Sequence, residues 1–461
     1  AAPPSGLVLS EVQRQVLQDL LDTLSIAVGV DQLLPGLAPL MTPLDEAALR
    51  MLLDKRQAMP AEPELPHVFR AADLPVVSAA PSRKMNILFV SGEFPNPLHG
   101  GGGRVFDVIR HLSRVANIYL YAWYIEERDR KAYQMIKPYC RGFRGVSVED
   151  FEAGHVGWIQ ELTHNVPIDV VHYEWPRALY NYAPALGKLH VFTYIEATSL
   201  RLCLDLQQET VLSKRWLERM VQLLSALKIE TVDAARMDAR VVVTQKDGEF
   251  LARLNPALDS CVINTAVDID DFSLPDRPPE PHTLTFVGNY LHYPNEDAAR
   301  FFCEEVLPDI RRRIPDIKVF LVGAEPTEKV RAYHDGEHVV VTGTVDDIRP
   351  YIQRASVCLA PLVSGAGIRG KVNQYAMLRR VCVATTVAAV DLLYRDGQEI
   401  FIADDPAVFA DRVVYLLQNP EVCRQMGDAA YQVAQAHYDH RQVVDYLQRL
   451  YAHVTSRKGD Q

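Results

Sequence analysis

The sequence has few cysteines, and they are not spaced like metal ligands or a disulfide framework. The 461-residue chain contains seven, an odd number, widely separated and without a CxxC motif. We therefore expect buried free thiols in a reducing compartment rather than disulfides or a zinc site. No signal peptide is visible, so a cytoplasmic location is predicted.

The chain also lacks a long apolar run and a surplus of positive charge. No apolar stretch approaches the length of about 20 residues that a membrane-spanning helix needs. With 48 Lys and Arg against 59 Asp and Glu, the net charge is −11. This balance argues against general binding to nucleic acid or to an anionic membrane. What remains is a globular chain long enough for two or three domains.

Four segments of the chain differ in pattern. Residues 1–82 have leucines at helical spacing and then a proline-rich linker, without a chemical motif. They are expected to form a helical extension that caps or docks. Residues 83–273 and residues 274–438 each alternate apolar strands with helices, and residues 439–461 continue a helical end. The pattern predicts an α/β fold with two Rossmann-like domains, whose ligand would bind in the cleft that they face.

The strands of the two domains follow from short apolar runs. In the first domain they are expected at 86–91, 118–122, 146–148, 170–173, 191–195, 241–244 and 261–264. In the second domain they are expected at 284–287, 319–322, 339–342, 357–359, 381–384 and 400–402.

The stretch Ser364–Met377 is the strongest candidate site. It lies between an expected strand and an expected helix, contains Gly365 and Gly367, and places Arg369 two residues before Lys371. Glycine lets a ligand approach the backbone, and a helix start offers free N–H groups. Arg and Lys add positive charge. The pattern predicts a phosphate-binding turn, and a glycine-rich turn without a ligand is the alternative.

A run of four glycines, Gly100–Gly103, precedes Arg104 and an expected helix from 104 to 112. It does not directly follow a strand, and no acidic residue follows the second strand, so a nicotinamide site is not expected. We expect a loop whose N–H groups, those of Gly102 and Gly103 included, meet a phosphate or a sugar. A plain mobile loop is the alternative.

His172 and Glu174 end an expected strand and alternate along it, so their side chains should share one face. A histidine and a carboxylate at this edge can transfer protons or hold hydroxyl groups. A structural histidine is the alternative, and Glu196 at the end of the next strand is a weaker candidate. At the tip of the first strand of the second domain, we expect Gly288 to permit close approach of a ligand, and a plain strand-end turn is the alternative.

Asp268 and Asp270 fit a DxD metal pattern. No other carboxylate or histidine cluster supports it, so we expect no metal site there.

Several segments, in this order, resemble the GT-B-fold glycosyltransferases of the retaining, nucleotide-sugar type, family 4-like. Each match is short, but the ordered set is specific. The matching segments are Pro95–Arg104, Val242–Asp247, Asn264–Phe272, Phe286–Ala298, Leu321–Gly323, Val341–Gly343, Asp347–Tyr351 and Ser364–Met377.

The resemblance implies a hexosyltransferase-type enzyme that moves a sugar from a nucleotide diphosphate sugar to an acceptor, with retention and without metal or cofactor. The terminal helix would return to the first domain, against which the acceptor would lie. That acceptor is unidentified (a glycan, lipid, small molecule or protein), and a homo-oligomer is left open. The implied catalytic residues are His172, Glu174, Arg369 and Lys371. The implied donor-binding residues are Gly102, Gly103, Gly288, Asn289, Gly365, Gly367, Ile368, Arg369, Lys371 and Gln374.

The sequence departs from the family pattern at three positions. Gln374 stands where the family has an acidic residue that holds the donor ribose, and Ala366 replaces an earlier acidic residue. Glu174 replaces the second histidine of the family's HxH motif. Two alternatives on the same fold therefore remain: a catalytically inactive binding or scaffold protein, and an epimerase acting on the nucleotide sugar itself.

Overall fold

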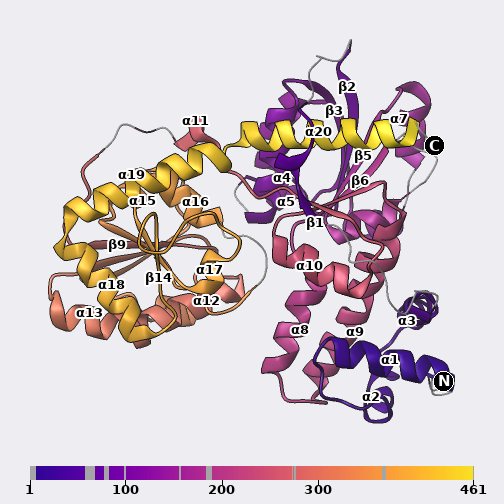
Figure 1. The fold of residues 1–461 in the computed structure, drawn as a ribbon, viewed down its shortest axis with the longest axis horizontal. Coiled ribbons are helices and arrows are strands. Elements are labelled where there is room, and N and C mark those ends of the chain that lie inside the picture. Colours follow the sequence, from indigo (N-terminus) through magenta and orange to yellow (C-terminus); the bar gives the residue numbers. More distant parts are fainter. Residues whose placement is uncertain are drawn as a thin grey trace. The chain divides into compact units, whose positions relative to one another are not determined.

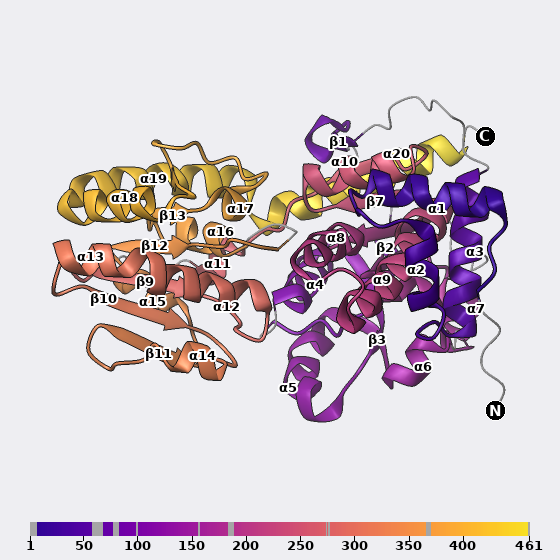
Figure 2. The same cartoon turned by 90° about the horizontal axis from the view of Figure 1, so that it is seen from below.

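The computed structural model describes residues 7–57, 68–76, 83–97, 100–154, 157–182, 189–272, 274, 277–365 and 370–459. The chain divides into two compact units, each with a parallel sheet flanked by helices (Figures 1 and 2). The predicted α/β class with two Rossmann-like sheets is thereby confirmed. The first unit comprises Ala1–Pro95, Leu112–Ile263 and Leu447–Gln461, and the second comprises Asn96–His111 and Asn264–Tyr446.

The first unit has an eight-stranded sheet in the order β1-β8-β7-β6-β5-β2-β3-β4. All strand pairs are parallel, and the central strands are almost fully buried, which explains their continuous apolar runs. The strands are β1 (Val68–Arg70), β2 (Met85–Ser91), β3 (Ala116–Trp123), β4 (Cys140–Val146), β5 (Val170–Glu174), β6 (Leu189–Tyr194), β7 (Ala239–Val242) and β8 (Ser260–Val262).

The fourth strand lies earlier than predicted. The expected strand at 146–148 was wrong, because β4 runs over Cys140–Val146 and Val148 already begins helix α6 (Val148–Glu152). Ser147 caps that helix by accepting a hydrogen bond from the Asp150 N–H at 3.1 Å. The sequence of β4 alternates arginine and glycine with few apolar residues, which an edge strand tolerates.

The other edge strand, β1, was not predicted. It lies within the segment expected to be an extended proline-rich linker, and it pairs in parallel with β8 over three residues. A three-residue strand carries too little periodicity to be recognised from sequence.

Three helices precede the first sheet, as the leucine spacing predicts: α1 (Glu11–Thr23), α2 (Val30–Leu37) and α3 (Pro43–Gln57). Their buried leucines share one hydrophobic core with α8 (Thr198–Gln208) and α9 (Lys214–Leu227). Helix α10 (Gln245–Leu254) packs against β1, β7 and β8. Helices α5 (Glu126–Ile136) and α7 (Gly157–Asn165) also belong to this unit.

Helix α4 (Gly100–Leu112) begins at the glycine run itself. The prediction that Gly100–Gly103 is a loop and that the helix starts at Arg104 was therefore wrong. The first four N–H groups of a helix need no partner within it, so glycine costs less here than in a helix interior.

The second unit has a six-stranded parallel sheet in the order β11-β10-β9-β12-β13-β14. Its strands are β9 (Thr283–Val287), β10 (Lys318–Val322), β11 (Val339–Gly343), β12 (Val357–Ala360), β13 (Cys382–Ala384) and β14 (Phe401–Ile402). Its helices include α11 (Ile269–Phe272), α12 (Tyr293–Arg300), α13 (Leu307–Arg313), α14 (Glu328–Arg331), α15 (Arg349–Arg354), α16 (Gly370–Met377), α17 (Thr386–Ala389), α18 (Pro406–Gln418) and α19 (Pro420–His437).

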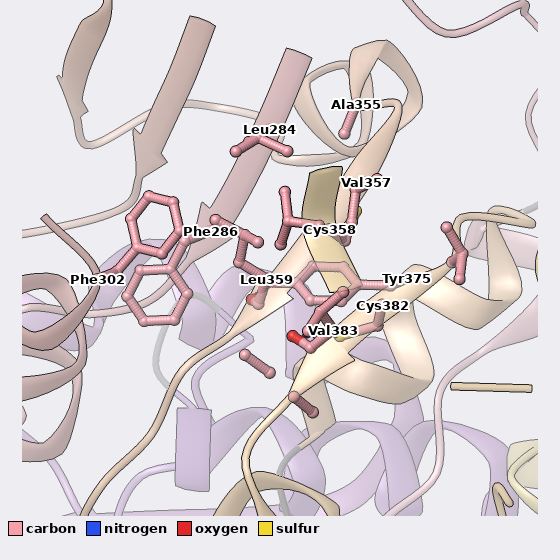
Figure 3. Packing of buried hydrophobic residues seen from close by; sticks show 14 of the residues in the cluster. Leu284, Phe286, Phe302, Ala355, Val357, Cys358, Leu359, Tyr375, Cys382 and Val383 are labelled. Carbon is pink, nitrogen blue, oxygen red and sulfur yellow. Dashed lines mark hydrogen bonds between the residues drawn. The ribbon is translucent and has the colours of Figure 1, made fainter. Parts of the chain in front are cut away.

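The core of the second unit fixes helix α16 to the sheet. Tyr375 of α16 is fully buried among apolar side chains of β9, β12 and β13 (Figure 3). Its hydroxyl accepts a hydrogen bond from the Val287 N–H at 3.0 Å and donates to the Leu359 carbonyl at 3.2 Å. Because these two residues lie at or near the carboxyl ends of β9 and β12, Tyr375 holds helix α16 against that edge of the sheet.

All seven cysteines are free, as predicted, and four of them are buried. Cys358 and Cys382 lie in the core of the second unit, where burial raises the pKa of both thiols (Figure 3).

Helix α20 (His440–Gly459, yellow in Figure 1) begins in the second unit, and its residues from Leu447 onward belong to the first. Within the first unit, Lys458 forms an ion pair with Asp238 at 2.6 Å, and Arg449 donates to the Leu74 carbonyl at 3.3 Å. Among the described residues, no helix combines the length and apolar character required to span a bilayer.

Candidate active site

The carboxyl ends of β9 and β10 approach each other closely at two glycines. The Gly288 N–H donates to the Val322 carbonyl at 2.9 Å. Gly323 has φ 144°, and a Cβ built on it would lie only 1.8 Å from the Gly288 carbonyl oxygen. Only glycine can occupy position 323, and this close approach leaves the tip of β9 without bulky side chains.

Asn295 of α12 lies against this tip. A Cβ on Gly288 would come within 2.9 Å of the Asn295 amide, so glycine at 288 makes room for that side chain. The Asn295 Nδ2 group donates to the Asn289 carbonyl at 2.8 Å, which orients the amide and leaves Oδ1 as an acceptor. Asn295 is 9% exposed, so its amide is buried, whereas Gly288, Asn289 and Lys371 are half-buried.

Lys371 is held by this amide. Its Nζ donates to Asn295 Oδ1 at 2.7 Å, and the ammonium lies 4.4 Å from the ring centre of Phe286 on β9. Both contacts suit a cation, since an amide oxygen accepts and an aromatic face attracts positive charge. The second unit thus brings Gly288, Asn289 and Lys371, which the sequence analysis named, together at one edge of its sheet.

Gln374 follows Lys371 by one turn of α16 and is half-buried. The next helix position is anchored by the Tyr375 contacts, and Asn373 accepts a hydrogen bond from the Tyr394 hydroxyl at 2.9 Å. The loop toward α16 passes through Gly365, whose φ of 107° favours glycine. The predicted residues Gly367, Ile368 and Arg369 lie outside the described residues, as does Ala366.

Comparison with known proteins shows which family the segment around this site resembles. Residues 281–419 match the model of the family described as Glycosyl transferases group 1. A phosphatidyl-myo-inositol mannosyltransferase of Mycobacterium tuberculosis is 27% identical over 215 residues, which cover 42% of this chain and 54% of that protein. An uncharacterized 44.6 kDa protein in the cps region of Klebsiella pneumoniae is 23% identical over 169 residues, which cover 35% and 43%. The chain thus spans about half the length of the curated relatives it matches.

Solved structures share the fold. Sucrose-phosphate synthase from Thermosynechococcus elongatus has a TM-score of 0.61 at 14% identity, covering 81% of this chain and all of that one. Anabaena Alr3699/HepE in complex with UDP and glucose has a TM-score of 0.62 at 10% identity, covering 80% and 99%. The chain shares the GT-B fold of these structures, and its residues 281–419 resemble the glycosyl transferases of group 1. In this GT-B chain, the matched family segment contains the whole cluster around Lys371.

Two glycines of the GT-B chain named as donor ligands, Gly102 and Gly103, lie in the first turn of α4. Their N–H groups belong to the four at a helix start that have no partner within the helix. A Cβ on Gly103 would lie 3.7 Å from the Pro97 carbonyl oxygen, an ordinary contact, so packing does not require glycine at that position.

His172 and Glu174 of the GT-B chain point to the same face of β5, as strand alternation predicts. His172 Nε2 lies 3.4 Å from Glu174 Oε1, and both side chains are fully buried. His172 Nδ1 is 2.6 Å from the Tyr451 hydroxyl of α20, and Nε2 is 2.7 Å from the Thr193 hydroxyl of β6. These contacts favour the structural alternative for His172, because both ring nitrogens bind hydroxyl groups that join α20 to the sheet of the first unit.

We expect Tyr451→Phe to lower the free energy of unfolding of the first unit by about 1–2 kcal/mol. The change removes the short hydrogen bond between the Tyr451 hydroxyl and the buried imidazole of His172. Urea unfolding would measure it, with Tyr415→Phe, a half-exposed tyrosine of α18, as the control. A loss no larger than that of the control would contradict the assignment.

The carboxylate of Asp268, the first residue of the DxD pattern, contacts two side chains of α4. Its Oδ2 lies 2.6 Å from Arg110 Nη2 and 2.6 Å from His111 Nε2, while Oδ1 accepts the Asp270 N–H at 2.8 Å. Burial alone would raise the pKa of Asp268. The His111 hydrogen bond and the Arg110 charge outweigh burial, so the pKa lies well below its usual range. The described part of the chain contains no group of three His, Cys, Asp or Glu that could hold a metal ion.

The sequence analysis did not identify Asn295 as a site residue. Lys371 and Asn295 are 76 positions apart, so no local pattern connects them. The only signal in the sequence is that Asn295 lies within Phe286–Ala298, one of the segments that resemble the family.

Proposed function

We propose that this chain transfers a sugar from a nucleotide diphosphate sugar to an acceptor hydroxyl, with retention at the anomeric carbon and without a metal ion. The observation that supports it most is the buried amide of Asn295, which holds the Lys371 ammonium at 2.7 Å beside the tip of β9. An oriented cation next to a strand end without side-chain bulk suits a diphosphate. A GT-B structure of the same fold was obtained with UDP and glucose, which agrees with such a donor.

In this proposal, the donor diphosphate lies between the tip of β9 and the start of α16. Lys371 and Arg369 hold its charge, and the N-terminus of α16 adds its partial positive charge. As the glycosidic bond breaks, the leaving diphosphate gains negative charge, which these groups stabilise without reorganisation. Gly288, Gly365 and Gly367 allow the backbone to approach the ligand. Ile368, next to Gly367 in the sequence, is also assigned to the donor, and the Asn289 amide lies beside it. Gly102 and Gly103 offer helix N–H groups to the donor.

In this proposal, Gln374 binds the donor ribose. Glu174 and His172 have a structural role instead, at the carboxyl end of β5 in the first unit. A neutral amide hydrogen bond contributes about 1 kcal/mol and a charged one about 1.5–3 kcal/mol. Gln374 should therefore hold a ribose hydroxyl more weakly than a carboxylate would.

Nucleotide diphosphate release tests the proposal. The full chain is incubated with UDP- and GDP-sugars and a panel of saccharide, lipid and small-molecule acceptors, with and without EDTA. At least one donor and acceptor pair should release the nucleotide diphosphate, and EDTA should leave the rate unchanged. Binding without release would support the scaffold alternative. Consumption of donor without an acceptor and without diphosphate release would support the epimerase alternative.

We expect Gln374→Glu to increase affinity for the donor nucleotide about tenfold, because it restores a charged hydrogen bond to the ribose. Calorimetric titration of UDP and GDP would measure the change. Gln418→Glu on the exposed end of α18 adds the same charge away from the site and serves as the control. Weaker binding in Gln374→Glu than in the control would show that position 374 faces the diphosphate instead.

A further inference from the structure

Helix α3 of the first unit is apolar on two faces. The face that packs with α9 carries three buried leucines, Leu49, Leu52 and Leu53. On the opposite face, Leu44 is 82% exposed and Met51 is 41% exposed, and Ala47 between them is exposed as well. Because one apolar face is enough to attach a helix to a core, the second stripe has no role in that core.

The exposed stripe has the spacing of a seam between paired helices. Leu44 and Ala47 are three residues apart, and Ala47 and Met51 are four apart. This alternation keeps the three side chains in line along one face of the helix. The small alanine in the middle lets a facing helix approach closely, while leucine and methionine on either side supply apolar area.

The stripe lies at the edge of the first unit, where α3 packs beside α1 and α9 (Figures 1 and 2). Gln13 of α1 donates to Asp54 at the end of α3 at 3.2 Å, so the start of α1 lies beside that end of the stripe. Val12, the residue before Gln13, is 61% exposed. Single exposed apolar side chains are normal, whereas several on adjoining helices mark a contact surface.

Two opposite charges lie on one flank of the stripe. Glu46 is half-buried and Arg50 is exposed, and they are one helical turn apart. Among the described residues, Arg50 has no ion-pair partner. The arginine is therefore available to a carboxylate of another molecule.

The charges are complementary to themselves when two copies of α3 run antiparallel. With Leu44 of each copy facing Met51 of the other, Glu46 of each comes within about one residue of the other's Arg50. Two reciprocal ion pairs can then form beside the apolar stripe, and such pairs set partner and orientation. A parallel pair would instead bring each charge level with the same charge of the other copy.

We propose that the stripe of Leu44, Ala47 and Met51 binds the same stripe of a second copy of this chain, in an antiparallel helix pair that makes a homodimer. A symmetric dimer needs a patch that is complementary to itself, and this stripe with its reciprocal charges is one. An anionic membrane would need a basic surface around the stripe. Residues 7–57 contain seven acidic and four basic side chains, which favours a second copy over a membrane.

The inference is independent of the proposed sugar transfer, because no donor or acceptor residue takes part in it. A helix of this length buries less than the roughly 1,200 Å² of a standard stable interface, even with the start of α1 added. We therefore expect a weak dimer, with a Kd of about 1–100 µM.

Sedimentation of the full chain between about 1 and 200 µM tests the inference. The unaltered chain should pass from monomer to dimer over this range. Met51→Glu should raise the Kd about tenfold or more, because it places a carboxylate against the apolar Leu44 of the other copy. Val408→Glu is the matched control, since Val408 of α18 is 44% exposed, and it should dimerise like the unaltered chain.

Charge exchange tests the antiparallel arrangement. Glu46→Arg and Arg50→Glu should each raise the Kd roughly three- to tenfold, because each places like charges together twice in the dimer. The double variant that carries both changes should return the Kd to that of the unaltered chain. A chain that stays monomeric at every concentration overturns the inference, as does a Met51→Glu protein that dimerises like the control. A double variant as weak as the single ones overturns the antiparallel pairing.

Discussion

Lys371→Ala should lower the affinity for UDP and GDP by about 10- to 150-fold, the equivalent of one charged hydrogen bond to a diphosphate. The loss in transfer rate should be larger still, because the diphosphate gains charge as the glycosidic bond breaks. The side chain is fixed by Asn295 at 2.7 Å and by the face of Phe286, so that its charge is oriented before a ligand arrives. Calorimetry and nucleotide release would measure the two effects separately.

Lys329→Ala is the matched control for this experiment. Lys329 lies in the same unit on α14, is 80% exposed, and pairs with Glu296 at 3.0 Å. Its loss should leave nucleotide affinity unchanged. A Lys371→Ala protein that is folded by circular dichroism and binds UDP like the control would remove the main support for the donor site. Asn295→Ala offers a second check, since it keeps the cation but releases it and should lower affinity less than Lys371→Ala.

Asp268→Asn should lower the free energy of unfolding by about 3 kcal/mol, because it takes the charge from a buried carboxylate paired with Arg110 and His111. The amide can still accept the Asp270 N–H at the start of α11, so the loss reports mainly the ion pairs. Urea unfolding at neutral pH would measure it.

The same variant should change how stability depends on pH. The pKa of Asp268 is lowered in the folded chain, despite burial, by the hydrogen bond of His111 and the charge of Arg110. The contribution of Asp268 is therefore present above the ordinary carboxyl pKa of 3.8 and is lost as pH falls below it. The difference between the unaltered chain and Asp268→Asn should shrink from pH 6 to pH 3.

Asp270→Asn is the control for both measurements, because Asp270 is exposed. It should change stability by less than about 0.5 kcal/mol. Equal losses in the two variants would contradict a role specific to Asp268.

The sheets were predictable because buried parallel strands are short apolar runs bounded by turns. Twelve of the predicted strands overlap β2, β3 and the strands from β5 to β14. The pattern failed at the two edges of the first sheet. There β4 contains arginine and glycine, and β1 has only three residues. Both edge strands are partly exposed, so their side chains need not be apolar, and the prediction relies on apolar runs.

Some features of the candidate site were also predictable from the sequence, and others were not. The local patterns are the glycines at strand tips, the spacing of Arg369 and Lys371, and the alternation of His172 with Glu174. The partners of these residues are not local. Tyr451 reaches His172 across 279 positions, and Asn295 reaches Lys371 across 76. A hydrogen bond between distant segments leaves no periodic trace in the sequence.

The sequence by itself determined the α/β class, the two tandem sheets, the family resemblance and the charge available at the start of α16. The fold class follows from the periodicity of apolar residues, and the glycine motifs follow from backbone conformations and close contacts that only glycine allows. Tertiary structure alone decided that an amide of α12 orients Lys371 and that His172 joins α20 to the first sheet. Each depends on which strand ends are neighbours, and strand order is set by packing of the whole sheet rather than by any one segment.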